Sequence, residues 1–402
     1  AYDGLLKGYQ YGASKIYELV INNDPCYAYL MSSNDFVSQK MVMAHVFGHC
    51  DFFKNNIYFS KTQRNMIDVM ANHAIRVRRY VDKYGHDKVE RFIDACLSLE
   101  NLIDPYLPFS GPPKREEPVK EDETTHIDIK KLAAKDYMDR YINPPEELKS
   151  QRQKAISERK KAVKFPQQPW KDVLLFLINY APLRRWQRDI LTIVRDEAYY
   201  FAPQAMTKIM NEGWATYWHS HIMTRKAATT AEIVDFAVTH SGVVATSRGR
   251  INPYALGIAL YQDIEERWDK GRHGAEWEAC DDMARRARWD TKAMAGRKKI
   301  FEVRRLYEDI TFISEFMTED FCQRHKLFTF DYNAGSGSYE IASREFRKVK
   351  EKLLSQLVNM GQPFIHVEDG NYANRSELLL KHDHAGVDLD VRYVNQTLMN
   401  LT

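Results

Sequence analysis

The chain has 402 residues, of which 44% are hydrophobic and 12% aromatic, a composition that excludes a disordered protein. Its 58 basic and 55 acidic side chains leave a net charge of +3, which argues against nucleic acid as a partner and against attraction to an anionic membrane. The chain contains no run of about 18 apolar residues and no signal-peptide pattern, so we expect a cytoplasmic protein without a membrane span. The cysteines are widely spaced and form no CxxC pair, which predicts scattered reduced thiols at Cys26, Cys50, Cys96, Cys280 and Cys322.

Hydrophobic periodicity predicts a mainly α-helical region in the first part of the chain. Apolar or small residues recur at steps of three and four between Val37 and Phe52, which indicates an amphipathic helix over 35–53. Comparable patterns predict further helices over 62–84, 87–104 and 189–225. We expect a break in the last of these helices at Pro203.

A strongly charged segment interrupts the helical pattern between Pro108 and Pro169. Gly and Pro residues open it, and two charged runs follow, over 114–123 and 146–164. Blocks of mixed sign most often form solvated surface rather than a binding tail. We therefore predict a linker or insertion with exposed helices.

The period of the pattern shortens beyond Leu327, which indicates strands. A Gly-rich turn over 334–337 separates two short β-type runs, and a helix over 344–360 follows. Further strands are predicted over 363–368, 378–382 and 387–393. The sequence thus predicts a helical metal-site domain in two parts, with a small α+β domain at the C-terminal end; the segments are 1–107, 108–169, 170–326 and 327–402.

Two stretches far apart in the chain have the pattern of one metal site. His45 and His49 are four residues apart in a predicted helix, so they stand one turn apart on one face and can bind a single divalent ion. A carboxylate from a second helix, Glu212, would complete a zinc site that keeps one position for water. His73 is a further candidate, as a fourth ligand or an outer partner. The alternative is a structural His–Glu network without an ion, because buried imidazoles need polar partners in either case.

The position of the general base is the main departure from a zinc peptidase. Peptidases of the HExxH type place a glutamate directly after the first histidine, where this chain has Val46. We expect Glu197 or His219 to move the proton instead. His219 lies two helical turns from Glu212 on the same face, so it is also a candidate further ligand. A buried Glu197 that pairs with an arginine is the structural alternative.

Several long runs of residues closely resemble the stage V sporulation protein R (SpoVR) family. The runs are 44–56, 197–204, 211–219, 252–257 and 367–372, so the resemblance covers nearly the whole chain. Membership implies a link to spore cortex formation, or to the stress response in bacteria that do not form spores. It also implies a PrkA-type serine kinase and related operon products as partners.

A looser similarity connects the chain to gluzincin metallopeptidases, some of which pair HExxH with a downstream Glu-Gly-Trp segment. Carried over residue by residue, this similarity makes His45, His49 and Glu212 the zinc ligands in a gluzincin-like helical metal site. It implies a zinc-dependent hydrolase of an amide or peptide bond, with Val46 as the departure. Two alternatives stay open: a regulatory or scaffold protein that acts with the kinase, and an iron-dependent oxidoreductase, since two histidines and a carboxylate also bind iron.

Overall fold

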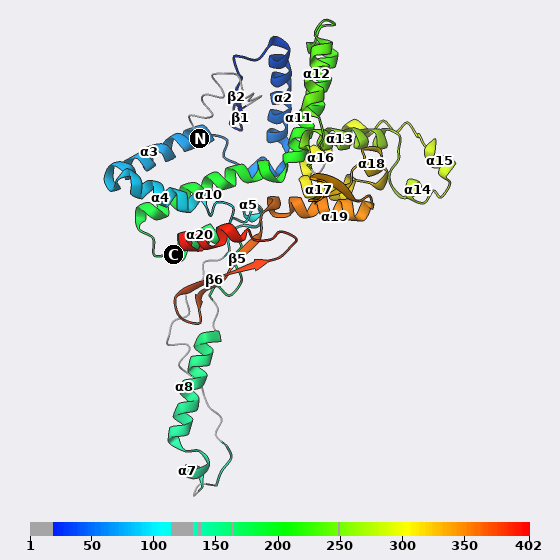
Figure 1. Cartoon of the computed structure of the whole chain (residues 1–402). Coiled ribbons are helices and arrows are strands. Elements are labelled where there is room, and N and C mark those ends of the chain that lie inside the picture. The colour runs from blue at the N-terminus through cyan, green and yellow to red at the C-terminus, as the bar shows by residue number, and fades with distance from the viewer. Residues whose placement is uncertain (1–18, 114–131, 136–137, 163–164, 248–249) are drawn as a thin grey trace. The chain divides into compact units, whose positions relative to one another are not determined.

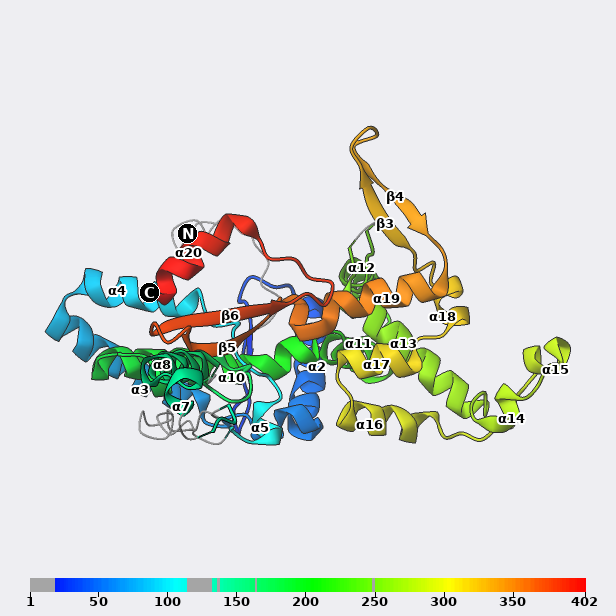
Figure 2. The same ribbon diagram turned by 90° about the horizontal axis from the view of Figure 1, so that it is seen from below.

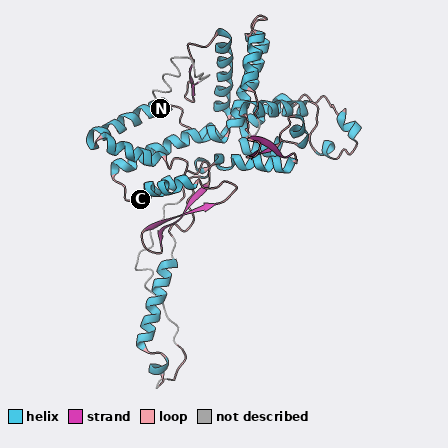
Figure 3. Ribbon diagram, in the orientation of Figure 1, coloured by secondary structure: helices cyan, strands magenta, loops and turns pink. Residues whose placement is uncertain are grey.

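The computed structural model describes residues 19–113, 132–135, 138–162, 165–247 and 250–402. In these ranges the protein is mainly helical, as predicted, with short two-stranded antiparallel sheets (Figures 1 and 3). No helix among them combines the length and the apolar character needed to cross a lipid bilayer. The predicted charged run over 114–123 lies outside the described residues.

Contacts divide the chain into two units, Ala1–Arg76 with Tyr199–Gly361, and Val77–Ala198 with Gln362–Thr402. The boundaries between the units fall within α3 (Met66–Tyr84) and within α10 (Arg185–Met206). The sequence predicted a different division, into the segments 1–107, 108–169, 170–326 and 327–402. That division stays a prediction.

The first unit contains most of the helices. Besides the start of α3 and the end of α10, its elements are β1 (Leu19–Ile21), β2 (Tyr27–Tyr29), α2 (Phe36–Asn55), the 3-10 helix η1 (Ile57–Lys61), α11 (Lys208–Ile222), the π-helix η2 (Met223–Ala227), α12 (Ile233–Val243), α13 (Pro253–Asp269), α14 (Ala275–Glu278), α15 (Met283–Ala287), α16 (Gly296–Leu306), α17 (Asp309–Phe316), α18 (Glu319–Arg324), β3 (Thr329–Asn333), β4 (Ser338–Ser343), α19 (Phe346–Leu357) and η3 (Val358–Gly361).

Helix α11 is the central element of the first unit, and it packs against both α2 and α13 (Figure 2). Glycines allow the backbones to approach closely. A Cβ added to Gly48 of α2 would lie 2.5 Å from Cα of Ala215, and one added to Gly213 would lie 2.4 Å from Cα of Gly257 on α13. The large side chain of Trp214 is fully buried in the surrounding core. Small residues at the crossings therefore determine where α11 sits.

The predicted helix over 35–53 is confirmed as α2, which begins where the Asp35 side chain accepts a hydrogen bond from the Ser38 N–H. The predicted break in the helix over 189–225 was misplaced. Pro203 lies inside α10, and the backbone leaves helical geometry at Thr207 before α11 begins. Pro203 has no N–H to donate, but the next turn continues, and the Thr207 N–H donates to the Pro203 carbonyl.

The second unit contains the rest of the described elements, α4 (His86–Leu97), α5 (Leu107–Ser110), α7 (Asp139–Ile142), α8 (Pro145–Ala162), α9 (Val173–Tyr180), β5 (Phe364–Tyr372), β6 (Glu377–Asp383) and α20 (Val391–Leu401), with parts of α3 and α10. Helix α8 confirms the helix predicted within the charged segment. Trp170 and Val367 exchange backbone hydrogen bonds, and both pack with Val173 and Phe176 in a small core.

Most of the β-strands predicted near the C-terminal end are confirmed, as β3, β4, β5 and β6, and α19 confirms the helix between them. The strand predicted over 387–393 was wrong, because α20 begins at Val391, where Asp390 accepts a hydrogen bond from the Arg392 N–H. Apolar residues at 391, 394, 398 and 401 follow the helical period, which the shorter window up to 393 could not show. Contacts assign β3, β4 and α19 to the first unit, and β5, β6 and α20 to the second.

Candidate metal centre

The structure brings together the three predicted ligands, His45 and His49 of α2 and Glu212 of α11. One ligand atom from each lies within 4.8 Å of the other two. Nε2 of His45 is 3.4 Å from Oε2 of Glu212, and Nε2 of His49 is 3.5 Å from the same oxygen. The imidazoles are almost completely buried, whereas 18% of the Glu212 side chain is exposed. Within the ranges that the structure describes, this donor set is compact enough to hold a cation.

Local geometry explains why these three side chains meet. The two histidine rings lie one helical turn apart, with centroids 4.6 Å from each other and planes nearly perpendicular. Gly48 stands between them in the sequence and lets α2 approach the backbone of α11 at Ala215. Glu212 precedes Ala215 by almost one turn, so the same helix crossing places its carboxylate against the imidazoles.

A second layer of polar groups holds the other ring nitrogens of the two histidines. Nδ1 of His49 donates to Oδ1 of Asn211 at 2.9 Å. Nδ1 of His45 lies 2.9 Å from Nδ1 of His219, and Nε2 of His219 lies 2.9 Å from Nδ1 of His240 on α12. Burial lowers the pKa of His240 below its ordinary value. Outer contacts of this kind orient metal-binding histidines and determine which nitrogen carries the proton.

Sequence reasoning identified His219 but missed the roles of Asn211 and His240. Asn211 stands directly before the predicted ligand Glu212, and this position in the sequence could have indicated that it lies near the metal site. His240 lies on a separate helix, and no spacing in the chain connects it to the histidine pair. Tyr254 was also missed, although its ring centroid lies 5.9 Å from that of His45.

The other predicted site residues lie outside the donor group. His73 is buried on α3 and does not belong to the group, and its role as a ligand stays a prediction. Glu197 lies on the part of α10 that belongs to the second unit, where the neighbouring Arg195 forms an ion pair with Asp172 at 2.7 Å. Its role as a base likewise stays a prediction. Val46 is buried, and it occupies the position at which a zinc peptidase has its glutamate.

A buried carboxyl group holds the start of the helix that carries Glu212. Oδ2 of Asp309 accepts from the Ile209 N–H at 2.8 Å, and Oδ1 accepts from the Met210 N–H at 2.9 Å. These N–H groups belong to the first turn of α11, which has no intrahelical partner for them. Complete burial raises the pKa of Asp309 to about 8, against the opposing effect of the two hydrogen bonds.

The chemistry of the donor set suits a transition metal. Two imidazole nitrogens and one carboxylate oxygen are the usual protein ligands of a catalytic zinc ion, and they also bind iron. The side chains of Asn211 and His219 supply the outer hydrogen bonds that such ligands require.

Comparison with known proteins identifies the family of the chain. The family model described as "SpoVR like protein" matches residues 1–362. A relative from Escherichia coli (strain K12), described as "Uncharacterized protein YcgB", is 30% identical over 413 residues, which cover 94% of this chain and 75% of the relative. No solved structure matches the chain significantly, and the similarity to gluzincins stays a prediction. The chain belongs to the SpoVR-like protein family.

Proposed function

We propose that this SpoVR-like protein is a metal-dependent hydrolase that cleaves an amide or peptide bond. In this proposal His45, His49 and Glu212 bind one divalent cation, for which zinc is the first candidate. In the same proposal it is cytoplasmic and acts in spore cortex formation or the stress response, as the family name and the resemblance suggest.

The observation that carries the metal proposal is the spacing of the donor atoms. N–H···O hydrogen bonds usually measure about 2.7–3.2 Å, whereas the two distances from imidazole nitrogens to the Glu212 oxygen are 3.4 and 3.5 Å. In a tetrahedral zinc site with bonds of about 2.0–2.1 Å, two ligand atoms stand about 3.3–3.4 Å apart. The spacing therefore fits three ligands around an ion better than a directly hydrogen-bonded network.

Hydrogen bonds around the site support the same assignment. Asn211 accepts from Nδ1 of His49, so the neutral ring presents its Nε2 lone pair toward Glu212. His45 presents its Nε2 lone pair in the same way when its Nδ1–H donates to Nδ1 of His219. The Nε2–H of His219 then donates to His240. One set of tautomers thus satisfies all these contacts and leaves both Nε2 atoms available.

A bound zinc ion would supply Lewis acidity and lower the pKa of its water. The residues of the chain would hold the ion and transfer protons. His219 orients His45 through Nδ1. Because Val46 replaces the usual glutamate, Glu197 remains the proposed general base, with His219 as the second candidate.

Metal content tests the first part of the proposal. We expect about one equivalent of zinc in the protein purified without added metal, and loss of the metal in His49→Ala and in Glu212→Ala. His86→Ala, on the exposed start of α4, is the matched control and should keep the metal. A well-folded wild type that contains no metal, and that zinc or iron does not reload, would contradict the metal centre. Iron in place of zinc would support the oxidoreductase alternative.

Activity and metal binding can be separated with Glu197→Gln. If Glu197 is the base, this variant should keep its zinc and lose at least about 100-fold in the rate of amide hydrolysis. The measurement is a screen of amide substrates, with peptidoglycan precursor peptides among them, using zinc-loaded wild type and variant. An unchanged rate would exclude Glu197 as the base.

The buried Val46 favours one alternative, a regulatory or scaffold protein. Replacement of the catalytic glutamate by an apolar residue is a simple way for a hydrolase fold to lose activity while it retains its metal ligands. In that case the protein would act by binding a PrkA-type kinase or related operon products. Zinc-loaded protein that cleaves no amide substrate but co-purifies with the kinase would support this alternative.

A further inference from the structure

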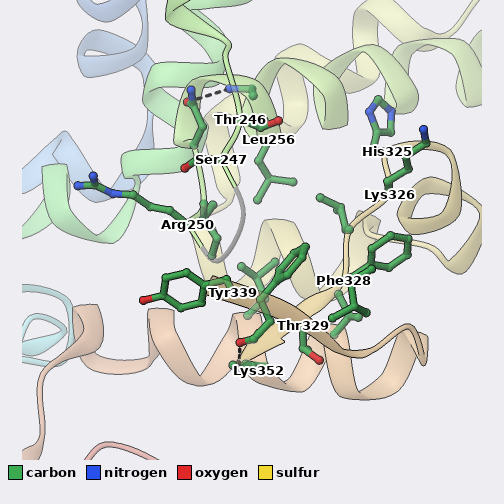
Figure 4. A pocket seen from close by; sticks show the side chains of 18 of the residues that line it. Thr246, Ser247, Arg250, Leu256, His325, Lys326, Phe328, Thr329, Tyr339 and Lys352 are labelled. Carbon is green, nitrogen blue, oxygen red and sulfur yellow. Dashed lines mark hydrogen bonds between the residues drawn. The ribbon is translucent and has the colours of Figure 1, made fainter. Parts of the chain in front are cut away.

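A cavity of about 740 Å³ lies in the first unit, and none of the candidate metal ligands lines it. Its walls come from the start of α13 and the loop before it, from α18, from the β3–β4 hairpin and from α19 (Figure 4). This volume is within the range of small-molecule sites, about 300–1,000 Å³. The cavity is therefore large enough for a ligand of its own.

The walls of the cavity are mainly apolar. Leu256 of α13, Phe321 of α18 and Leu353 of α19 are buried at its inner side, and Phe328 and Ile341 come from the strand region. Figure 4 shows the side chains of Leu256, Phe328 and Tyr339 around the space. Such walls favour an apolar body by releasing water from both surfaces.

Two polar side chains of the lining are already engaged in structural hydrogen bonds. Oδ1 of Asn252 accepts from the backbone at the start of α13, and its Nδ2 donates to the carbonyls of Val243 and Ala245. The Thr329 hydroxyl donates to the Ser343 carbonyl. These two groups are therefore not available to a ligand.

Cationic side chains stand at the edges of the cavity. The charge of Lys352 is not available to a ligand, because its ammonium group donates to the Phe330 carbonyl and pairs with Asp331 at 2.8 Å. Arg250 and Lys326 are exposed, and neither forms an ion pair or a side-chain hydrogen bond with any residue that the structure describes. Burial lowers the pKa of the neighbouring His325, so this ring carries less charge at neutral pH than an ordinary histidine. Two cations are therefore available to an anion, and the carboxylate in the lining, Glu340, already accepts hydrogen bonds from Asn333 and Ser336.

We propose that this cavity binds an amphipathic anion of the fatty-acid type, with its acyl chain against the apolar walls and its carboxylate at Arg250 or Lys326. The proposal does not depend on the metal centre, because the two sites share no residue. It adds a ligand site to the proposed function.

A fluorescent fatty acid and its uncharged methyl ester test the proposal. The full chain should bind the acid saturably and about fivefold more tightly than the ester, since a partly exposed ion pair contributes about 1 kcal/mol. The double variant Arg250→Glu/Lys326→Glu should lose this preference by weakening acid binding about fivefold. Lys298→Glu, an exposed lysine on α16 outside the cavity, is the matched control and should bind like the wild type.

Filling the cavity tests its location. Ala259 lines the cavity from α13, so Ala259→Trp should abolish binding of both probes while the circular dichroism spectrum is retained. Ala255→Trp serves the same purpose if the first variant does not fold. Absence of saturable binding to the wild type, or binding that survives in a folded filling variant, would refute the site. Equal affinity for acid and ester would refute the anionic class of ligand.

Discussion

Asp309 has the most strongly perturbed carboxyl group next to the candidate metal centre, and its titration should be measurable. Burial raises the pKa of Asp309 from 3.8 to about 8, so the folded protein holds a proton that the unfolded chain releases in this range. The stability that this group contributes is complete below about pH 4 and is lost as the pH rises to about 8. The free energy of unfolding of the wild type, relative to Asp309→Asn, should therefore fall by up to about 1.4 kcal/mol per pH unit in this window.

Urea unfolding between about pH 4 and 9 checks this prediction. The exposed Asp320, on α18, offers a control in Asp320→Asn, which should give a curve parallel to that of the wild type. Parallel curves for Asp309→Asn as well would show that the carboxyl group ionises normally in the folded protein.

The five cysteines are free thiols, and two of them, Cys26 and Cys50, lie in hydrogen-bond contact rather than apart. Their side chains form a hydrogen bond, which lowers the pKa of Cys26 to about 7, whereas burial raises the pKa of Cys96 to about 12. Iodoacetamide at neutral pH should alkylate Cys26 at least about tenfold faster than Cys96, because the thiolate is the nucleophile. Cys50→Ala should slow the alkylation of Cys26. Peptide mass spectrometry measures both rates, and equal rates in wild type and variant would contradict the pairing.

At the scale of elements, the close approach of α11 to α13 should tolerate no extra methyl group. Gly213→Ala would place a Cβ 2.4 Å from Cα of Gly257, so we expect a loss of about 1–3 kcal/mol in the free energy of unfolding. Gly242→Ala in α12 is the matched control, since a Cβ there meets nothing within 4 Å. It should be neutral or stabilise the helix by about 0.5–1 kcal/mol. Equal effects of the two variants in denaturant titrations would show that the helix crossing is looser than described.

At the scale of the whole molecule, metal removal should affect one unit and not the other. A cation bound between α2 and α11 stabilises the folded state of the unit that contains both helices. Chelation should therefore increase amide hydrogen exchange in α2 and α11, and leave α9 and the β5–β6 hairpin unchanged. His49→Ala should show the faster exchange without chelator and no further response. A uniform increase throughout the chain would contradict a local metal centre.

Local rules in the sequence determined much of this protein. The i and i+4 spacing of His45 and His49, the start of α2 at Asp35 and the hairpin turn before β4 all depend on residues within one or two turns of each other. The helical nature of the first unit follows from periodicity in the same way. The failure at α20 has a local cause too, because the window over 387–393 ended before the helical period became visible.

The sequence named Glu212 and His219 as candidates, but only the tertiary structure shows that they lie beside the histidine pair and that Asn211 and His240 surround it. His45 meets Glu212 across 167 positions in the chain, and His219 across 174. Asp309 reaches the start of α11 from 100 residues away. No local periodicity connects such residues. The glycine-mediated crossing of α2 and α11 brings His45 to Glu212 and His219. The cavity beside α13 also depends on tertiary structure, since its walls come from elements that meet only when the first unit is folded. Spacing along the chain determined the histidine pair, whereas packing between helices determined its surroundings, because hydrogen bonds and burial depend on distance in space.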